Sequence, residues 1–514
     1  MSTTDPTSAE PQPLSPPQWS PANVFSWLAI VAMVVVFLAQ NGTFDTAVQQ
    51  GVPTVSAAVS PQVGILVRFA NVAGAAPDST QAPADAQAPA SSQAPSNAQA
   101  SSTGPAAGNA QFAMQLSALG GSVNDMLKDI EPGGELGCAV VLARLGQVQD
   151  AQKAVADLEA RIAAGKAKSF PEFDTLVKDV NTALNAIASK QAGPTALTEA
   201  QVHMLKSELG SAGDSLVAMA TNDVKTQDEL AGRAIVTVLA LGAVVVLGIL
   251  VALLGFVALG VMLVMGIKGR LVGVQPPTAP AGRYAAVFAI WLGSFYLLHK
   301  GPSWFMGAVS PEVALSISIA GSVISCGIAL WSARMLGIGW KQFAADTGLT
   351  RPAFSDLLWG AVCYCMALAL LLVGLCVVFV LLAMAGSPGL KASHPIQQIV
   401  SDSGWFGLAL TFVVASVCAP LFEELFFRGA LYQNLRATWG PWVGALGAGA
   451  VATAVSSVVF AAIHPQGLMF VPVLGALAVA FCLMREWRGT ILPGMWAHAI
   501  NNGIMITLNI LLLR

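Results

Sequence analysis

The stretch 234–267, AIVTVLALGAVVVLGILVALLGFVALGVMLVMGI, contains no charged residue and decides the class of fold. About 20 apolar residues in a helix are enough to cross the ~30 Å hydrocarbon core of a bilayer. The stretch is longer than that, so it predicts a membrane-spanning helix that is tilted or extends beyond the bilayer. Composition agrees, because 10% of the 514 residues are charged, whereas a soluble domain carries about 25%.

Further apolar segments of similar character follow to the C-terminus, and we assign residues 234–400 to transmembrane helices. An apolar run at 23–40 lacks the basic start and the small-residue cleavage site of a signal peptide, so we expect an uncleaved first span. The predicted fold is all-α, a polytopic membrane helix bundle of about nine spans with a small soluble helical insert. The remaining predicted spans are 284–298, 313–333, 357–385, 405–427, 441–463, 468–484 and 490–513.

Basic residues are distributed unevenly among the short connections between these spans. Cytoplasmic loops are enriched in Lys and Arg. We therefore expect a multi-pass protein of the plasma membrane or an equivalent membrane, with a cytoplasmic N-terminus and with residues 41–233 outside the cytoplasm. The basic residues of alternate connections are Lys268, Arg270, Arg283, Arg334, Lys341, Arg351, Arg428, Arg436, Arg485 and Arg488, whereas the other connections hold Lys300, Lys391 and the terminal Arg514.

Three segments before residue 234 differ from the membrane part. Residues 1–22 are rich in Pro and Ser and are predicted to be a disordered tail. Residues 41–110, which include QAPADAQAPASSQAPSNAQA, are predicted to be a flexible linker. Residues 111–230 carry apolar stripes at helical spacing, one of them after SFPE, a capping-box signature, and another after TEAQ, and predict an extracytoplasmic helical bundle. We interpret this bundle as a spacer or as a module that binds a partner. The stripes are Ala151, Val155, Leu158 and Ile162; Phe173, Leu176, Val177, Val180, Leu184 and Ile187; and Val202, Leu205 and Leu209.

The segment CAPLFEELFFRGALYQNL at 418–435 places charged residues where the chain otherwise predicts a membrane span. One charge at the centre of a membrane helix costs about 2.5 to 3.5 kcal/mol on insertion scales. Glu424 and Arg428 are four residues apart and can neutralise each other on one helix face. Glu423 is rotated by about 100° and has no basic residue one turn away. An alternative is that both glutamates lie just past the cytoplasmic end of the span, paired with Arg428 and Arg436.

Two histidines occur in the apolar segments that follow. His464 ends the stretch FAAIH, and His498 lies in WAHAINN with Asn502 four residues later on the same helix face. A carboxylate, two imidazoles and a carboxamide that converge in a helix bundle can bind and activate a water molecule. The carboxylate would accept the proton of the water, an imidazole would orient the water or hold a metal ion, and an imidazole with the amide would stabilise an oxyanion.

The three stretches EELFFR (Glu423–Arg428), FAAIH (Phe460–His464) and HAINN (His498–Asn502) resemble, in order and separation, the motifs of a known family. This is the CAAX-protease and bacteriocin-processing family of intramembrane proteases, which includes the type II prenyl-protein endopeptidase. The motifs are individually weak and together specific. The resemblance covers about 400–514, so we assign residues 401–514 to a protease core of this type. It implies a helical bundle with a water-filled cavity and hydrolysis of a peptide bond.

The resemblance also implies functions for single residues. Glu423 matches the water-activating base, with His464 beside it. His498 and Asn502 match the pair that stabilises the oxyanion. Glu424 and Arg428 match a pair that orients the site, in agreement with their spacing.

The resemblance does not decide the metal dependence of the enzyme. A zinc ion held by Glu423, His464 and His498 and a metal-free, glutamate-dependent mechanism both remain open. The expected substrate is a membrane protein or peptide in the lipid bilayer. The net charge of −3 gives no indication of a nucleic-acid partner. The bundle at 111–230 is a candidate site for a protein partner.

The spacing of the two histidines sets a geometric condition on the shared site. A straight perpendicular helix over 441–463 would place His464 ~33 Å above the start of that helix. His498 would lie only ~12 Å above the start of the last span. The two can share one water molecule only if the glycine-rich stretch GPWVGALGAGA, 440–450, leaves the straight path, for example along the membrane interface.

Two other functions are compatible with these residues. A membrane transporter or proton relay also uses buried ionisable groups. A catalytically inactive relative would act as a membrane scaffold or an immunity protein. The intact motif residues favour the intramembrane endopeptidase.

Overall fold

The computed structural model describes residues 21–48, 61–74, 132–165, 172–305, 311–385, 404–464 and 466–513. Over these ranges every regular element is a helix, and no strand occurs. The predicted all-α membrane helix bundle is therefore confirmed, whereas the predicted number of nine spans is not. Within the described ranges, five helical stretches are long and apolar enough to cross a membrane: 224–267, 312–335, 354–384, 405–462 and 468–488.

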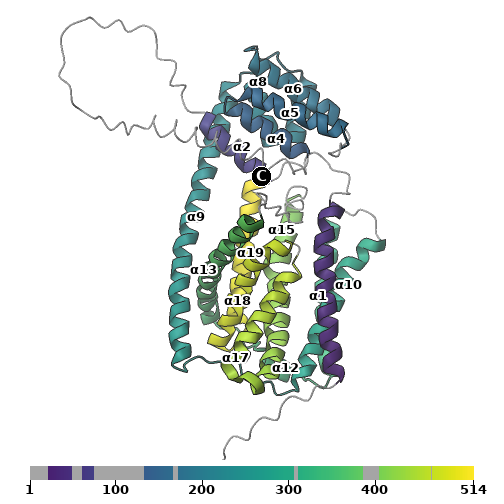
Figure 1. The fold of residues 1–514 in the computed structure, drawn as a ribbon, viewed down its shortest axis with the longest axis vertical. Coiled ribbons are helices and arrows are strands. Elements are labelled where there is room, and N and C mark those ends of the chain that lie inside the picture. Colours follow the sequence, from purple (N-terminus) through teal and green to yellow (C-terminus); the bar gives the residue numbers. More distant parts are fainter. Residues whose placement is uncertain are drawn as a thin grey trace, which may run out of the picture. The chain divides into compact units, whose positions relative to one another are not determined.

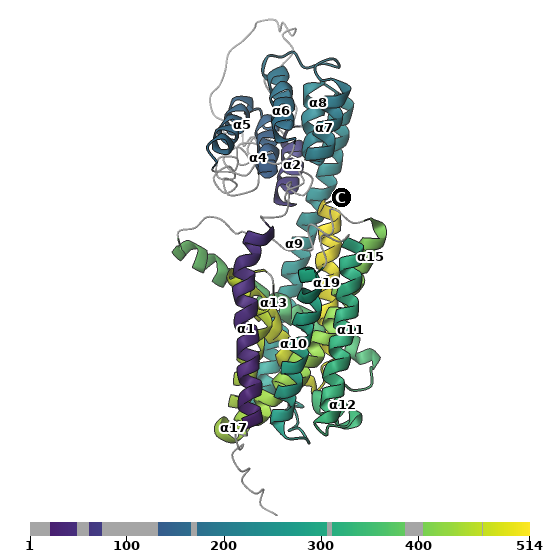
Figure 2. The ribbon, with the colours of Figure 1, turned by 90° about the vertical axis from the view of Figure 1, so that its right-hand side faces the viewer.

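The chain divides into two compact units, which are shown in Figures 1 and 2. The first unit contains the N-terminal helix and the helices between residues 247 and 508. Its elements are α1 (Pro21–Val48), the second part of α9 (Val224–Ile267), α10 (Ala281–Phe305), α11 (Pro311–Met335), α12 (Trp340–Thr347), α13 (Phe354–Ala385), α15 (Trp405–Val413), η2 (Val414–Cys418), α16 (Ala419–Glu423), η3 (Glu424–Leu431), α17 (Tyr432–Ala462), η4 (Leu468–Phe470), α18 (Val471–Arg488) and α19 (Leu492–Leu513).

Helices far apart in the sequence pack side by side in this first unit. α1 packs along α10, and α18 packs against both α13 and α17 (Figures 1 and 2). Small residues allow the closest approaches: a side chain at Gly374 would collide with the backbone of Pro472. α18 is therefore central to the unit, and side chains on both of its faces reach neighbouring helices.

Aromatic side chains fix η3 against α10. The rings of Trp291 and Phe426 stack with centroids 4.7 Å apart, and Phe288 meets Phe427 edge to face at 5.2 Å. All four side chains are buried. Aromatic pairs in these geometries add stabilisation beyond the area that they bury. This packing holds the segment that carries the two glutamates.

A buried polar cluster ties the ends of several helices together. The Asp346 carboxylate accepts hydrogen bonds from Thr278 and from the Tyr284 hydroxyl, the latter at 2.6 Å. Arg485 donates to the Asp346 carbonyl and to the Gln433 side chain. Because buried polar groups need partners, this cluster fixes α12, α18 and the connection after α9 relative to one another.

The second unit is a helical bundle formed by residues between 61 and 246. Its core is apolar and follows the predicted stripes, with Ala151, Leu158, Phe173, Leu184 and Leu205 buried. Its elements are α2 (Pro61–Gly74), α4 (Pro132–Arg144), α5 (Val148–Ala163), α6 (Phe173–Ala188), α7 (Glu199–Leu209), α8 (Ser211–Ala220) and the first part of α9.

The bundle differs from the sequence-based expectation in two places. α2 lies inside the predicted linker 41–110, and Val63, Val67 and Ala70 form a buried stripe on it that packs against α4 and α8. The second difference is at the start of α6. The stretch SFPE predicts a capping box there, but α6 begins after Glu172, which has a φ of 72° and makes no side-chain cap. A complete capping box occurs instead at the start of α7, between Thr198 and Gln201. The predicted tail and the stretch from 75 to 131 lie outside the described residues, apart from the first residues of α1.

Candidate active site

The two glutamates sit on a continuous helical segment that contains two π-helical stretches, η2 and η3. A π turn is wider than an α turn and is often found at functional sites. Pro420 lies between the two stretches, and its ring clashes with the carbonyl four residues earlier in a regular α-helix. Glu423 ends the α-helical turn between the two stretches and Glu424 begins η3, so their side chains point in different directions.

Glu424 is held in a fully buried ion pair. Arg428 Nη1 donates to Glu424 Oε1 at 2.8 Å, and the side chains are 1% and 0% exposed. Arg428 Nη2 also donates to the carbonyl of Ala478 on α18, at 3.3 Å. His498 Nδ1 lies 3.1 Å from Glu424 Oε1. Removing either charge would leave the other uncompensated in the protein interior.

Two aromatic rings enclose the Arg428 guanidinium. Its Cζ lies 4.5 Å from the ring centre of Phe460 and 5.1 Å from that of Phe481. Phe481 also stacks on the His498 ring, with centroids 5.3 Å apart and an interplanar angle of 23°. Ring faces attract cations, so the cage favours the charged arginine and restricts the plane of the imidazole.

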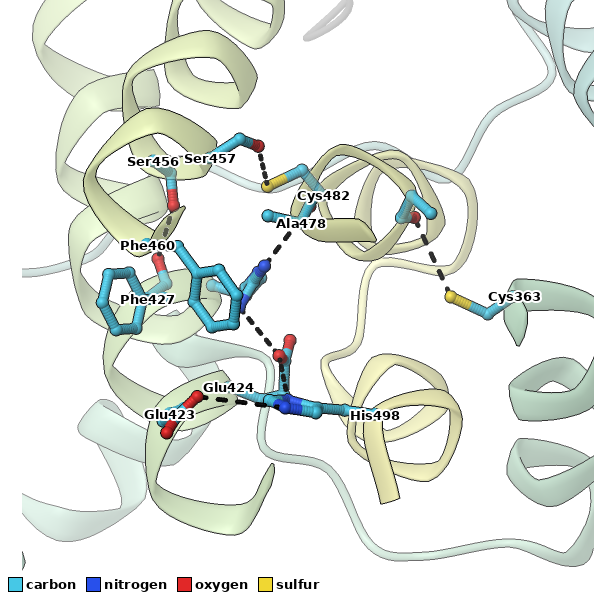
Figure 3. Close-up of polar contacts among 12 residues, drawn as sticks. Cys363, Glu423, Glu424, Phe427, Ser456, Ser457, Phe460, Ala478, Cys482 and His498 are labelled. Carbon is cyan, nitrogen blue, oxygen red and sulfur yellow. Dashed lines mark hydrogen bonds and ion pairs between the residues drawn. The ribbon is translucent and has the colours of Figure 1, made fainter. Parts of the chain in front are cut away.

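Glu423 faces two histidines, His464 and His498, and its contact with His498 is drawn in Figure 3. Its Oε2 atom lies 3.8 Å from His464 Nε2 and 3.9 Å from His498 Nε2. The Glu423 side chain is 16% exposed, but Oε2 itself is buried and has no hydrogen-bond partner among the described residues. Separations of 3.8 and 3.9 Å are too long for direct hydrogen bonds, and a water molecule can bridge polar atoms at such distances.

Hydrogen bonds on the far sides of the rings orient both imidazoles. His464 Nδ1 lies 2.6 Å from the carbonyl of Phe460, four residues earlier in α17. Since a carbonyl only accepts, this contact places a proton on Nδ1 and turns Nε2 toward Glu423. His498 Nδ1 faces the Glu424 carboxylate in the same way. The FxxxH spacing therefore has a physical reason, because it lets the backbone of Phe460 orient His464.

The geometric condition on the two histidines is met by a break in α17. Gly444 has φ 70° and ψ 176° inside the stretch Tyr432–Ala462, so two helical pieces meet there at a kink. Pro441 lies just before it. The stretch from residue 441 is thus not one straight helix, and His464 and His498 come within 4 Å of the same Glu423 oxygen.

Asn502 makes its hydrogen bonds away from Glu423. Its Nδ2 atom donates to the carbonyl of Ala415 in η2 at 2.7 Å, and its Oδ1 atom accepts from Asn501 at 3.1 Å. The structure thus brings Glu423, Glu424, Arg428, His464 and His498 into one set of contacts. Asn502 adjoins this set through its place on α19, one turn after His498.

Some residues at the site carry no motif. The carbonyl of Ala478 and the ring of Phe481 both come from α18, one helical turn apart. Gly494 lies one turn before His498, and a Cβ there would be 3.1 Å from Glu424 Oε2. The i, i+4 spacing to His498 is the signal that marks Gly494 in the sequence. Nothing in the sequence singles out Ala478 or Phe481.

The donor types at Glu423, His464 and His498 are those of a catalytic zinc centre. Ligand atoms at 2.0–2.1 Å from a tetrahedral ion lie about 3.4 Å apart, and the two observed separations are 3.8 and 3.9 Å. Among the described residues no group of three or more such side chains has the spacing of a metal site. The chemistry of the donors fits zinc, while their separation is wider than zinc requires.

Comparisons with known proteins agree with the motifs. Residues 405–504 match the family model described as "Type II CAAX prenyl endopeptidase Rce1-like". Neither the curated proteins nor the solved structures contain a match to this chain. The family resemblance that the three motifs indicate is therefore confirmed, and residues 405–504 carry the Rce1-like pattern of the type II CAAX prenyl endopeptidases.

Proposed function

We propose that this protein is an intramembrane endopeptidase in which Glu423 activates the attacking water molecule. The observation that supports this most directly is the position of Glu423 Oε2. It is buried and unpartnered among the described residues, and two imidazole Nε2 atoms face it at 3.8 and 3.9 Å. The match of residues 405–504 to a family of prenyl endopeptidases supports the same reaction class.

In the proposed reaction the water molecule lies between Glu423 and the imidazole of His464. Glu423 accepts a proton as the water oxygen bonds to the carbonyl carbon of the substrate. The resulting oxyanion is stabilised by the second N–H of the Asn502 amide and by His498, which can donate from Nε2 when both of its ring nitrogens carry protons. Glu423 then returns the proton to the leaving nitrogen as the C–N bond breaks.

Glu424 and Arg428 orient this arrangement. Glu424 accepts from Arg428 and from His498 Nδ1, so it is committed to holding the imidazole and is not the base. The division of labour is the physical reason for two adjacent glutamates: one is neutralised in the core, and the other faces the site.

Zinc is the alternative electrophile. Glu423, His464 and His498 would hold it, and it would polarise the substrate carbonyl and lower the pKa of bound water. In that case Glu423 would be a ligand. Glu424 is held by Arg428, and Glu486, near the end of α18, is held by Arg436 and Tyr432. If Glu423 were a zinc ligand, neither of these two glutamates would be free to act as the general base. We therefore favour a glutamate-dependent mechanism, in which Glu423 is the base.

The substrate class follows from the location of the site. The glutamates lie in a stretch, 405–462, that is long and apolar enough to cross a membrane. A peptide bond must therefore enter the membrane region to be cut, which favours a membrane-associated protein or peptide. The bundle between residues 61 and 246 is a candidate module for recruiting such a substrate.

The test compares membrane peptides from cells that produce the wild-type protein, Glu423→Gln or Glu312→Gln. Glu423→Gln keeps the size of the side chain and removes the base, and loss of a general base lowers rates by roughly 10²–10⁴-fold. Glu312 lies in the first turn of α11 and serves as the control. Peptides that are present with the wild type and Glu312→Gln but absent with Glu423→Gln would support the proposal and identify the substrate. Identical peptides in all three samples would contradict the proposed endopeptidase activity. A transporter or proton relay, or a non-catalytic scaffold, would then be the remaining functions.

A further inference from the structure

The helix that carries the glutamates contains a carbonyl for which the helix offers no regular donor. The N–H of Ala419 bonds to the carbonyl of Val414, five residues earlier. The next bond in this pattern would run from residue 420 to the carbonyl of Ala415. Residue 420 is a proline, which has no N–H. The sequence at this one position thus leaves the Ala415 carbonyl available to a partner outside the helix.

That partner is Asn502 on α19. Its Nδ2 atom donates to the Ala415 carbonyl at 2.7 Å. Asn501 donates to Asn502 Oδ1, so both ends of the amide are fixed. An unsatisfied backbone carbonyl costs several kcal/mol in the bilayer core, so this contact has a strong driving force.

The contact sets the position of α19 at the site. His498 lies four residues before Asn502, on the same helix face, and its Nδ1 reaches Glu424 Oε1 at 3.1 Å. Around it the two helices come close, since a Cβ on Gly503 would lie 3.6 Å from Ser416 Oγ. α19 is therefore attached to the glutamate helix by two polar contacts one turn apart.

We propose that Pro420 is a positioning residue for the site: it frees the Ala415 carbonyl for Asn502, and this lock holds His498 against the two glutamates. The inference rests on the proposed function for its effect on catalysis, but the lock itself is a statement about structure. Asn502 then acts in two ways, because one N–H holds α19 and the other remains to face the substrate.

The test uses Pro420→Ala, Asn502→Ala and the double variant. Pro420→Ala restores an N–H at position 420, so the Ala415 carbonyl finds a donor within its own helix. Alanine is the better helix residue, so this variant should fold with an unchanged or higher melting temperature. Pro472→Ala is the matched control, because Pro472 lies at the start of α18, where no helix N–H is needed.

The first measurement is kcat and KM on a peptide that the wild type cleaves. A displaced catalytic group lowers rates by up to roughly 100-fold, so we expect a large loss of kcat in Pro420→Ala with little change in KM. The double variant should be no slower than Asn502→Ala alone, because both changes remove one lock. The proposal would be overturned if Pro420→Ala had the kcat of the wild type. It would also be overturned if the loss of kcat in the double variant equalled the product of the losses in the two single variants.

The second measurement does not depend on cleavage. The ¹⁵N NMR signal of His498 Nδ1 reports its contact with Glu424, and it should shift in Pro420→Ala and Asn502→Ala but not in Pro472→Ala. An unshifted signal in both variants would overturn the lock. A wild-type protein that cleaves nothing would count against the proposed function alone, because the NMR result still decides on the lock.

Discussion

Glu424 Oε1 and Arg428 Nη1 lie 2.8 Å apart, in side chains that are 0% and 1% exposed. Glu423, the preceding residue, has no ion pair with a Lys or Arg among the described residues and faces two imidazoles. A second carboxylate within an apolar membrane-type helix is costly, so its presence indicates a function. The contrast between the neighbours is therefore the clearest sign of a working site.

Glu424→Ala should destabilise the protein far more than Glu423→Gln. Breaking a buried ion pair from one side costs about 3–5 kcal/mol, because the remaining charge is uncompensated. Glu423→Gln removes no buried pair and should leave the unfolding temperature close to that of the wild type. Thermal unfolding of the purified variants in detergent measures both. Equal unfolding temperatures for Glu424→Ala and the wild type would contradict the structural assignment of this pair.

Arg428→Lys should fail to replace arginine. The guanidinium donates to Glu424 and to the Ala478 carbonyl and lies against two rings, whereas an ammonium is a compact charge on a flexible stem. We expect a loss of about 1.5–3 kcal/mol, the range for hydrogen bonds to charged groups. Arg334→Lys, at the exposed end of α11, is the control. The prediction fails if chemical denaturation shows both variants to be equally stable.

The sequence was sufficient to predict the class of fold and the residues of the three motifs. Long uncharged stretches determine membrane helices directly. The spacing of Glu424 and Arg428 reveals their pairing, because a one-turn separation brings side chains together on any helix. The pairing persists although both residues lie in the π-helical η3, because four residues are close to one turn in either kind of helix.

Other features could not be predicted because they depend on departures from regular helices. The hydrogen bond from Asn502 to Ala415 exists because Pro420 interrupts a π-helical pattern, and apolar periodicity carries no trace of such a pattern. The helix α2 was missed because its stripe lies beside low-complexity sequence. Phe481 contacts His498 across helices, and no spacing within one segment encodes that contact.

Gly444→Ala should lower both stability and activity. The φ of 70° and ψ of 176° lie in a region that is essentially restricted to glycine, and forcing another residue there costs about 1–3 kcal/mol. A shifted kink would also move His464, which follows the end of the same helix and is oriented by the Phe460 carbonyl. Gly440→Ala is the matched control, because its φ is ordinary and a Cβ there meets no atom within 4 Å. Unfolding temperature and kcat should fall for Gly444→Ala alone; equal values for the two variants would show that the kink does not position His464.

Removal of metal ions should leave most of the activity intact. A zinc ion bound by Glu423, His464 and His498 would occupy the carboxylate that we assign as the base, and Glu424 is committed to Arg428 and His498. The measurement is cleavage of a substrate peptide after dialysis against a chelator, with metal content determined by mass spectrometry. Activity within about twofold of the untreated protein agrees with a glutamate-dependent reaction, since a catalytic ion contributes several kcal/mol to the transition state and its loss would be far larger. Loss of activity that zinc restores would instead make Glu423 a ligand, and the base would then have to be sought among other groups.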